Sequence, residues 1–392
     1  MKNKLRRNNW LIAITLLVFA PFSLGQLQRV EFPFGGVYLF EIGIVLFLFS
    51  MLPRIVPKLL SRFRSSKITT KFLITWLALL TVLGCLSSDS LVPALYMARY
   101  LSYGLFAFLL VTQMPRSQSK KLPSLILSTG LFMTFLGLLQ YIFLPDTRFL
   151  RALGWDDHYF RAIGTLLDPN YFGMLIILTL SLAFSIRERL TKRLFWFLST
   201  FLLSMLALTY SRSSYLSGAF FIILATFVSK SKKFAFSIST VLLFSSLIFL
   251  TAPKPGGEGV DLLRTSSIES RISHETEINS DSTLQQIIFG KGLFVPKIYS
   301  NDQNLEMPNH ARQPNSILTL VYSGSGIVGL VVAIFVVTKF LRYLYKKDKY
   351  ITLGLIALLI HANFNNSILE PFLALFWLLL VVVVETKVQI ER

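Results

Sequence analysis

The chain has 392 residues, of which 53% are hydrophobic and only 15% are charged, and its mean hydropathy is +0.61. Soluble domains carry about 25% charged residues, so this composition excludes a string of soluble domains and indicates an integral membrane protein. The net charge of +19 does not indicate a nucleic-acid partner. The Lys and Arg residues form short clusters between apolar runs, which is the pattern of membrane-protein loops.

Apolar runs that could form transmembrane helices recur along almost the whole chain. In chain order they lie near 10–25, 37–52, 72–88, 90–113, 122–144, 169–186, 194–210, 215–228, 234–252, 315–338, 350–361 and 371–385. A membrane crossing needs about 20 residues, and we expect the flanks to extend the shorter runs to that length. The sequence therefore predicts an all-α polytopic membrane protein with about 12 transmembrane helices, built as a single integral membrane domain over residues 1–392.

The segments between these runs alternate in charge. Most of the 39 Lys and Arg residues lie in the segments 2–7, 54–71, 116–121, 187–193, 230–233, 339–349 and 387–392. With twelve spans, all of these segments fall on one side of the membrane, and the positive-inside rule makes that side the cytoplasm. We therefore expect a multi-pass protein of the cytoplasmic (inner) membrane with both termini in the cytoplasm.

The first apolar run allows two interpretations. It has a basic start, an apolar centre and Ser23-Leu24-Gly25 at its end, as a cleaved signal peptide would. It has no clear small-x-small cleavage site, and Pro21-Phe22 fits a retained anchor. We favour the anchor, and cleavage would leave the sidedness of the other spans unchanged.

Cysteine and histidine are too scattered to indicate a metal site. Cys85 is the only cysteine, and the histidines are His158, His274, His310 and His361. No two of them have the i, i+4 spacing of a zinc pair on a helix. We therefore expect neither a metal nor another cofactor.

Two segments on the expected outer side are long. The first covers 145–168, and the second covers 253–312, between the ninth and tenth spans. The second has helical spacing of its apolar residues over 261–289, followed by Gly290 and Gly292 as a stop. Long loops with helices of their own are commonly functional.

Unusual polar residues gather at the expected outer ends of the spans. Asp168 is placed to cap the helix that starts at Pro169, which is a structural role. Arg161 and Asn170 flank this helix N-terminus, where the positive end of the helix dipole suits an anion. Arg212 interrupts two apolar runs; it either reaches the outer headgroups or binds a ligand.

Arg99 lies inside the fourth span, where an unpaired charge costs at least about 2.5 kcal/mol. Glu41, an acid inside another span, is the predicted partner. The pair would either be a buried structural contact or line a polar cavity.

The end of the large loop carries another polar group. His310 and Arg312 precede Pro314-Asn315 and the tenth span, in which Gly324, Gly326 and Gly329 allow close helix packing or a local break. Arginine forks match phosphate geometry. A lipid diphosphate is therefore the expected ligand of the arginines. A histidine beside them could act as a general base on an acceptor hydroxyl.

Taken together, these residues resemble the O-antigen ligase and O-antigen polymerase superfamily. The resemblance covers 150–385, and its motifs are Arg161-x-x-Gly164, Asp168-Pro169-Asn170-x-x-Gly173, Ser211-Arg212, Ser270-Arg271, Gly290-Lys291-Gly292, His310 with Pro314-Asn315, and Gly326-x-x-Gly329. The number and polarity of the N-terminal spans agree with it. One position departs from the family pattern, which has His-Asn where this chain has Pro314-Asn315.

The resemblance implies metal-independent glycosyl transfer at the outer face of the cytoplasmic membrane. The donor would be a glycan on a polyprenyl diphosphate. The acceptor would be a lipid A core sugar in a ligase or another repeat unit in a polymerase, and some relatives glycosylate proteins. The implied catalytic residues are His310, Arg271 and Arg212, and the expected substrate-binding residues are Arg161, Asn170, Arg312, Asn315 and Arg99.

Two other classes of protein stay open on the sequence. A polysaccharide-related transporter or flippase would show internal repeats and ionisable residues at mid-membrane depth, of which only Glu41 and Arg99 are candidates. A non-catalytic membrane scaffold would need no convergence of arginines. The sequence favours the enzyme over both.

Overall fold

The computed structural model describes residues 10–32, 35–153, 155–253, 282–295 and 313–391. Within these ranges the chain is almost entirely helical, with one two-stranded antiparallel hairpin in which Arg29 pairs with Tyr38 and Phe32 with Gly35. The all-α class predicted from the sequence is confirmed. His310, Arg312 and Arg271, together with most of the predicted 261–289 helix, lie outside the described residues.

The elements follow one another in a long up-and-down series. Their bounds are α2 Trp10–Ile14, η1 Thr15–Phe19, α3 Ala20–Ser23, η2 Gly25–Gln28, β1 Arg29–Phe32, β2 Gly35–Tyr38, α4 Leu39–Ser65, α5 Ile68–Ser88, α6 Val92–Gln113, α7 Arg116–Ser119, α8 Leu122–Phe143, η3 Arg148–Leu153, η4 Gly164–Leu166, α9 Pro169–Ser185, η5 Arg187–Arg189, α10 Lys192–Ala207, α11 Arg212–Ser229, α12 Lys232–Thr251, α14 Leu284–Phe289, α16 Ile317–Lys347, α17 Lys349–His361 and α18 Pro371–Glu391.

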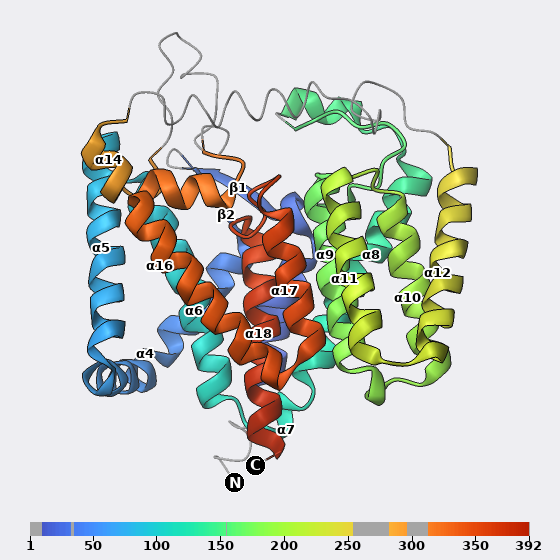
Figure 1. The fold of residues 1–392 in the computed structure, drawn as a ribbon, viewed down its shortest axis with the longest axis horizontal. Helices are drawn as coiled ribbons and strands as arrows, with labels where there is room; N and C mark the ends of the chain where they lie inside the picture. The colour runs from blue at the N-terminus through green and yellow to red at the C-terminus, as the bar shows by residue number, and fades with distance from the viewer. Residues whose placement is uncertain (1–9, 33–34, 154, 254–281, 296–312, 392) are drawn as a thin grey trace.

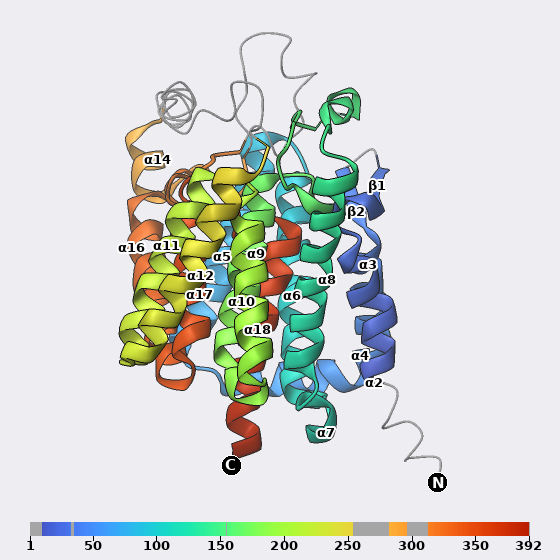
Figure 2. The ribbon, with the colours of Figure 1, turned by 90° about the vertical axis from the view of Figure 1, so that its right-hand side faces the viewer.

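The long helices stand side by side in one bundle (Figures 1 and 2). We call the end that carries β1, β2 and α14 the hairpin end, and the end that carries α7 and the end of α18 the basal end. α9 lies at the centre, where it packs against α8, α10, α11, α17 and α18. Every residue of α9 from Phe172 to Phe184 is buried. The core of the bundle is therefore built around α9.

The edge helices have the opposite character. α5 and α12 lie at opposite sides of the bundle in Figure 1 and expose large apolar side chains, among them Phe72 and Leu86 on α5 and Leu243 on α12. Apolar surface of this extent is unfavourable in water, so these faces fit a lipid environment.

Six helices in the described residues are long and apolar enough to cross a membrane, or seven if the bent α4 counts as one span. They are α5, α6, α8 with α7 before it, α11, α12 and α16. Each of the predicted apolar runs coincides with a helix or a short series of helical turns. A count of twelve spans is not confirmed, since several of these helices, such as Pro169–Ser185 and Lys349–His361, are shorter than a full crossing.

α4 is bent by 78° between Leu39–Pro53 and Ile55–Ser65. Pro57 explains a bend at this point, because a proline cannot donate to the carbonyl four residues earlier, here that of Pro53, and its ring clashes with that carbonyl. Beyond it the helix lies across the basal end (Figures 1 and 2).

Of the two outcomes that the glycines of α16 allow, close helix packing or a local break, the structure shows a break. At Gly326 the backbone has φ 66° and ψ −170°, outside the helical region. Ahead of the break the helix crosses the hairpin end, and after it the helix descends through the bundle (Figure 1). The 284–294 segment packs against the break and is hydrogen-bonded to it. The amides of Lys291 and Gly292 donate to the carbonyls of Ser323 (2.8 Å) and Gly324 (3.0 Å).

We expect Gly326→Ala to destabilise the protein by about 1–3 kcal/mol. A Cβ there would lie 2.2 Å from the carbonyl oxygen of Ile288, and the positive φ disfavours alanine. The matched control is Gly104→Ala on α6, where an added Cβ meets nothing within 4 Å. The two melting temperatures in detergent test this, and equal values for both variants would contradict it.

Candidate functional site

The described candidate residues all lie toward the hairpin end. Arg161 precedes α9, Asn170 is in its first turn, and Arg212 is the first residue of α11. Asn315 lies just before α16, and Arg99 is on α6. The starts of α9 and α11, which pack against each other, thus form the centre of the candidate site.

Asp168 caps α9 as the sequence predicts. Its Oδ1 accepts hydrogen bonds from the amides of Asn170 (2.6 Å) and Tyr171 (3.0 Å). Burial raises the pKa of Asp168, while these two hydrogen bonds act in the other direction. The cap fixes the backbone that presents Asn170.

Arg161 joins the loop before α9 to the turn between α10 and α11. Its side chain is only 9% exposed and donates from Nε to the Thr209 carbonyl (3.0 Å) and from Nη2 to the Tyr210 carbonyl (3.1 Å). The Ala162 amide adds a bond to the Leu208 carbonyl (2.9 Å). Arg161 therefore holds the turn that leads into Arg212. Its predicted contact with a diphosphate stays a prediction.

A network of hydroxyl, amide and imidazole groups joins the first turn of α11 to α9, to the end of α17 and to the loop after α17. We call this network the serine–histidine cluster. Its members are Asn170, Ser211, Ser213, Ser214, His361, Asn365 and Ser367. Ser211 Oγ donates to Asn170 Oδ1 at 2.7 Å and also caps α11 by accepting from the Ser214 amide. The cluster thus couples the starts of α9 and α11.

His361 connects this cluster to the end of α17. Its Nε2 lies 3.1 Å from Ser213 Oγ and 3.2 Å from Ser214 Oγ, and its Nδ1 lies 2.9 Å from Ser367 Oγ. A serine beside a histidine is the arrangement of an activated nucleophile. However, His361 and Ser214 are both 0% exposed, so no substrate reaches them in this conformation. The geometry makes His361 a positioning residue for the turn that carries Arg212.

The segment before α16 lies against the 362–370 loop that follows His361. The Ile317 amide donates to the Ala362 carbonyl (2.9 Å), and Ser316 Oγ donates to Asn363 Oδ1 (3.2 Å). The Pro314 carbonyl accepts from Asn366 Nδ2 at 3.4 Å. Pro314-Asn315, where the resembling family has His-Asn, is therefore adjacent to the loop that begins with His361.

Sequence reasoning missed His361. It noted the residue only as one of four histidines, because it stands at the end of an apolar run. A usable signal was the polar segment His361-Ala362-Asn363-Phe364-Asn365-Asn366-Ser367 between two apolar runs. Such a run at the end of a buried helix needs polar partners.

Arg99 pairs with Glu41, as the sequence predicts. Arg99 Nε lies 2.7 Å from Glu41 Oε1, and Arg99 Nη2 donates to the Gly36 carbonyl at 2.6 Å. Tyr103 donates its hydroxyl proton to the same carboxylate, and Glu41 closes a capping box with the Tyr38 amide. Arg99 therefore ties β2 to the starts of α4 and α6. Its substrate-binding role stays a prediction.

Glu370 is a buried acid at the end of the 362–370 loop. Its Oε2 accepts from the Leu373 amide at 2.8 Å, and Gln26 Nε2 lies 3.5 Å from its Oε1. Burial raises the pKa of Glu370, hydrogen bonds from the amides of Leu373 and Phe372 lower it, and the charges of Asp168 and Arg99 raise and lower it respectively; the net pKa is about 8. The carboxyl group is thus largely protonated near neutral pH.

Among the described residues, no group of three or more His, Cys, Asp or Glu side chains could hold a metal ion. Comparisons of the chain with protein families, with curated proteins and with solved structures found no match.

We expect His361→Ala to destabilise the protein by about 1–3 kcal/mol, because the buried hydroxyls of Ser213, Ser214 and Ser367 lose a partner. His361→Asn retains one donor and one acceptor and should recover part of that loss. Melting temperatures of the purified protein in detergent test the order wild type, Asn, Ala. An unchanged melting temperature for the alanine variant would show that the cluster is not needed for stability.

The pKa of Glu370 gives stability a defined pH dependence. The folded pKa of about 8 is above the ordinary value of 4.5, so the folded chain keeps a proton that the unfolded chain releases between these values. Stability should therefore fall as pH rises from about 5 to about 8. Glu370→Gln imitates the neutral acid and should flatten this slope in a melting-temperature series. The same slope in the variant would assign it to other groups.

Proposed function

We propose that this protein is a membrane glycosyltransferase that moves a glycan from a polyprenyl diphosphate to an acceptor, as an O-antigen ligase or the related polymerase does. The observation that carries the proposal is the meeting of two helix N-termini with Arg212 at the hairpin end. α9 and α11 begin beside each other, joined by the Ser211–Asn170 hydrogen bond. Their dipoles place partial positive charge at one point, which suits a diphosphate.

Arg212 is the residue best placed to bind this anion. It is half-buried at the first position of α11, and the turn before it is held by the two carbonyl contacts of Arg161. A guanidinium offers two parallel donors to phosphate oxygens. In this proposal Arg161 acts mainly by fixing Arg212, while Asn170 and Asn315 line the same region.

The distribution of charge supports an outward-facing site. The basic segments 116–121, 187–193 and 230–233 lie at the basal end, where α7 and η5 are found and where α11 passes to α12. The positive-inside rule makes the basal end cytoplasmic, so the hairpin end would face outward in a twelve-span arrangement with both termini in the cytoplasm. The lipid-linked donor would enter laterally between helices.

The chemical step follows from these roles. An acceptor hydroxyl, deprotonated by His310 as general base, attacks the anomeric carbon, and the bond to the diphosphate breaks with inversion. Arg212 and Arg271 stabilise the charge that develops on the leaving diphosphate, which is usually the largest catalytic effect in such sites. No metal or other cofactor takes part in the proposed reaction. The acceptor would be a lipid A core sugar for a ligase or a repeat unit for a polymerase.

The position of the Arg99–Glu41 pair favours the enzyme over a transporter. A transporter would use ionisable groups near the middle of the membrane. Glu41 is in the first turn of α4 and contacts the strand residue Tyr38. The two charges therefore lie beside the hairpin, at one end of the bundle.

We expect Arg212→Ala to lower transfer about 10²–10³-fold, the loss seen when one donor to a developing charge is removed. Arg212→Lys should restore only part, because lysine keeps the charge without the fork. The matched control is Arg148→Ala, an exposed arginine in the loop before α9 that pairs with exposed Asp146.

The measurement is glycan size and attachment in a deletion strain complemented with each variant at equal membrane levels. Lipid-linked polymer left unattached in the deletion strain indicates a ligase, and accumulation of single repeat units indicates a polymerase. His310→Ala should fail to restore transfer as Arg212→Ala does. Unchanged glycans in the deletion strain, or full complementation by both variants, would refute the proposed function.

A further inference from the structure

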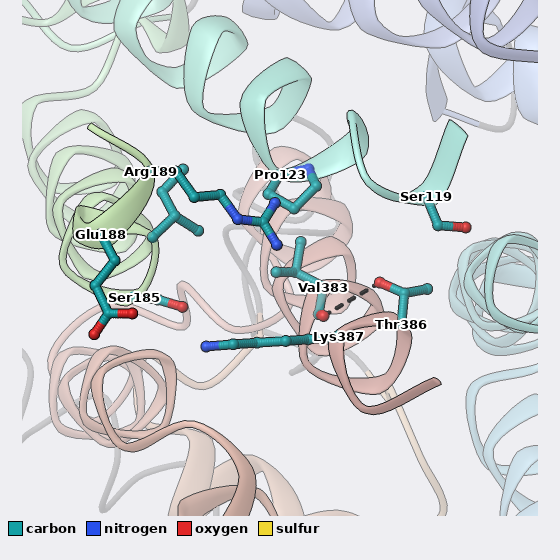
Figure 3. A pocket seen from close by; sticks show the side chains of 9 residues that line it. Ser119, Pro123, Ser185, Glu188, Arg189, Val383, Thr386 and Lys387 are labelled. Atoms are coloured by element: carbon teal, nitrogen blue, oxygen red, sulfur yellow. Dashed lines mark hydrogen bonds between the residues drawn. The ribbon is translucent and has the colours of Figure 1, made fainter. Parts of the chain in front are cut away.

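A pocket lies at the basal end, far along the bundle from the candidate site. It is formed by the end of α7, the start of α8, the end of α9 with η5, and the last turns of α18 (Figure 3). Its polar lining consists of Ser119, Ser185, Glu188, Arg189, Thr386 and Lys387. The remaining wall is apolar and includes Pro123 and Val383.

Two cations extend across this pocket. Figure 3 shows the Arg189 guanidinium and the Lys387 side chain reaching into the space between η5 and α18, whereas the Glu188 carboxylate lies at the margin. Arg189 is exposed, and its Nη1 donates to the Lys120 carbonyl at 3.3 Å. Lys387 Nζ lies 3.3 Å from Asp348 Oδ2. Both cations are thus held in place by neighbouring helices.

The two cations and the volume suit a small anion. The hydroxyl groups of the pocket wall donate within the protein: Ser119 and Thr386 to backbone carbonyls of their own helical turns, and Ser185 to Asp348, the same carboxylate that Lys387 contacts. The space inside the partly open pocket is about 60 Å³, room for a few water molecules or one phosphate group. Basic pockets between helices on the cytoplasmic side of membrane proteins bind anionic lipid headgroups.

We propose that this pocket binds a phosphate-bearing anion, either the headgroup of an anionic phospholipid in the adjacent leaflet or free phosphate. The phosphate would accept hydrogen bonds from Arg189 and Lys387, and acyl chains of a lipid would extend along the apolar faces nearby. Because α8, α9 and α18 all line the pocket, such a ligand joins the central helix α9 to two helices that pack against it. The proposal does not depend on glycosyl transfer.

The test is binding of phosphatidylglycerol to the purified full-length protein in a neutral detergent, counted by native mass spectrometry, with phosphatidylcholine as the comparison lipid. We expect preferential retention of phosphatidylglycerol. Arg189→Gln should weaken it about fivefold, the contribution of one cation near anionic lipid. Glu188→Gln, which removes the acid at the margin, should strengthen it.

The matched control is Arg193→Gln, an exposed cation on the next turn that does not line the pocket. It should leave retention unchanged. Displacement of the lipid by millimolar inorganic phosphate would identify free phosphate as the natural ligand, and resistance to phosphate would identify the lipid headgroup. Equal retention of both lipids, or equal effects of Arg189→Gln and Arg193→Gln, would overturn the proposal.

Discussion

The hydrogen bonds of His361 join the start of α11 to the loop that follows α17. One imidazole nitrogen faces Ser213 and Ser214 at the start of α11, and the other faces Ser367 in the 362–370 loop. That loop then reaches Ser316 before α16 through Asn363 and accepts a bond from Tyr100 of α6 at the Leu369 carbonyl (2.6 Å). Because the groups of His361, Ser213, Ser214 and Ser367 are buried, each needs its partner. The start of α11, and with it Arg212, has one arrangement as long as this network is intact.

Small residues let the helices approach closely enough for that network to form. Gly173 on α9 faces Ser214, and a Cβ there would lie 2.4 Å from the serine hydroxyl. At Gly25, where φ is 56°, a Cβ would lie 2.2 Å from the Thr165 carbonyl. The first contact sets the spacing of α9 and α11, and the second seats the turn before β1 against the loop that carries Arg161. At Gly164 a Cβ would lie 2.6 Å from the ring of Phe172, so the motif glycines Gly164 and Gly173 both have packing roles that do not depend on a ligand.

Much of the fold could be predicted from the sequence, because apolar runs, caps and breaks are local signals. The Asp168 cap, the Gly290 stop and the Arg99–Glu41 pair could be predicted from residue type and spacing, whereas the glycines of α16 left close packing and a local break both open. The role of His361 was not, since two of its partners, Ser213 and Ser214, are about 150 residues away along the chain. The contacts of Arg161 could not be predicted for the same reason. Its position beside a helix start indicated an anion as its partner, but in the folded chain it donates to the carbonyls of a turn that is distant in sequence.

The bend of α4 has a consequence for how the bundle sits in its surroundings. Beyond Pro53 the helix carries Leu59, Leu60 and Phe63 together with Lys58, Arg62 and Arg64, and it lies across the basal end. An amphipathic basic helix in this orientation matches those that float at a bilayer surface, with apolar side chains among the acyl chains and cations at the headgroups. Such a helix would oppose tilting of the bundle in the membrane. Tilting toward it would move its charged side chains into hydrocarbon, and tilting away would move its apolar side chains into water.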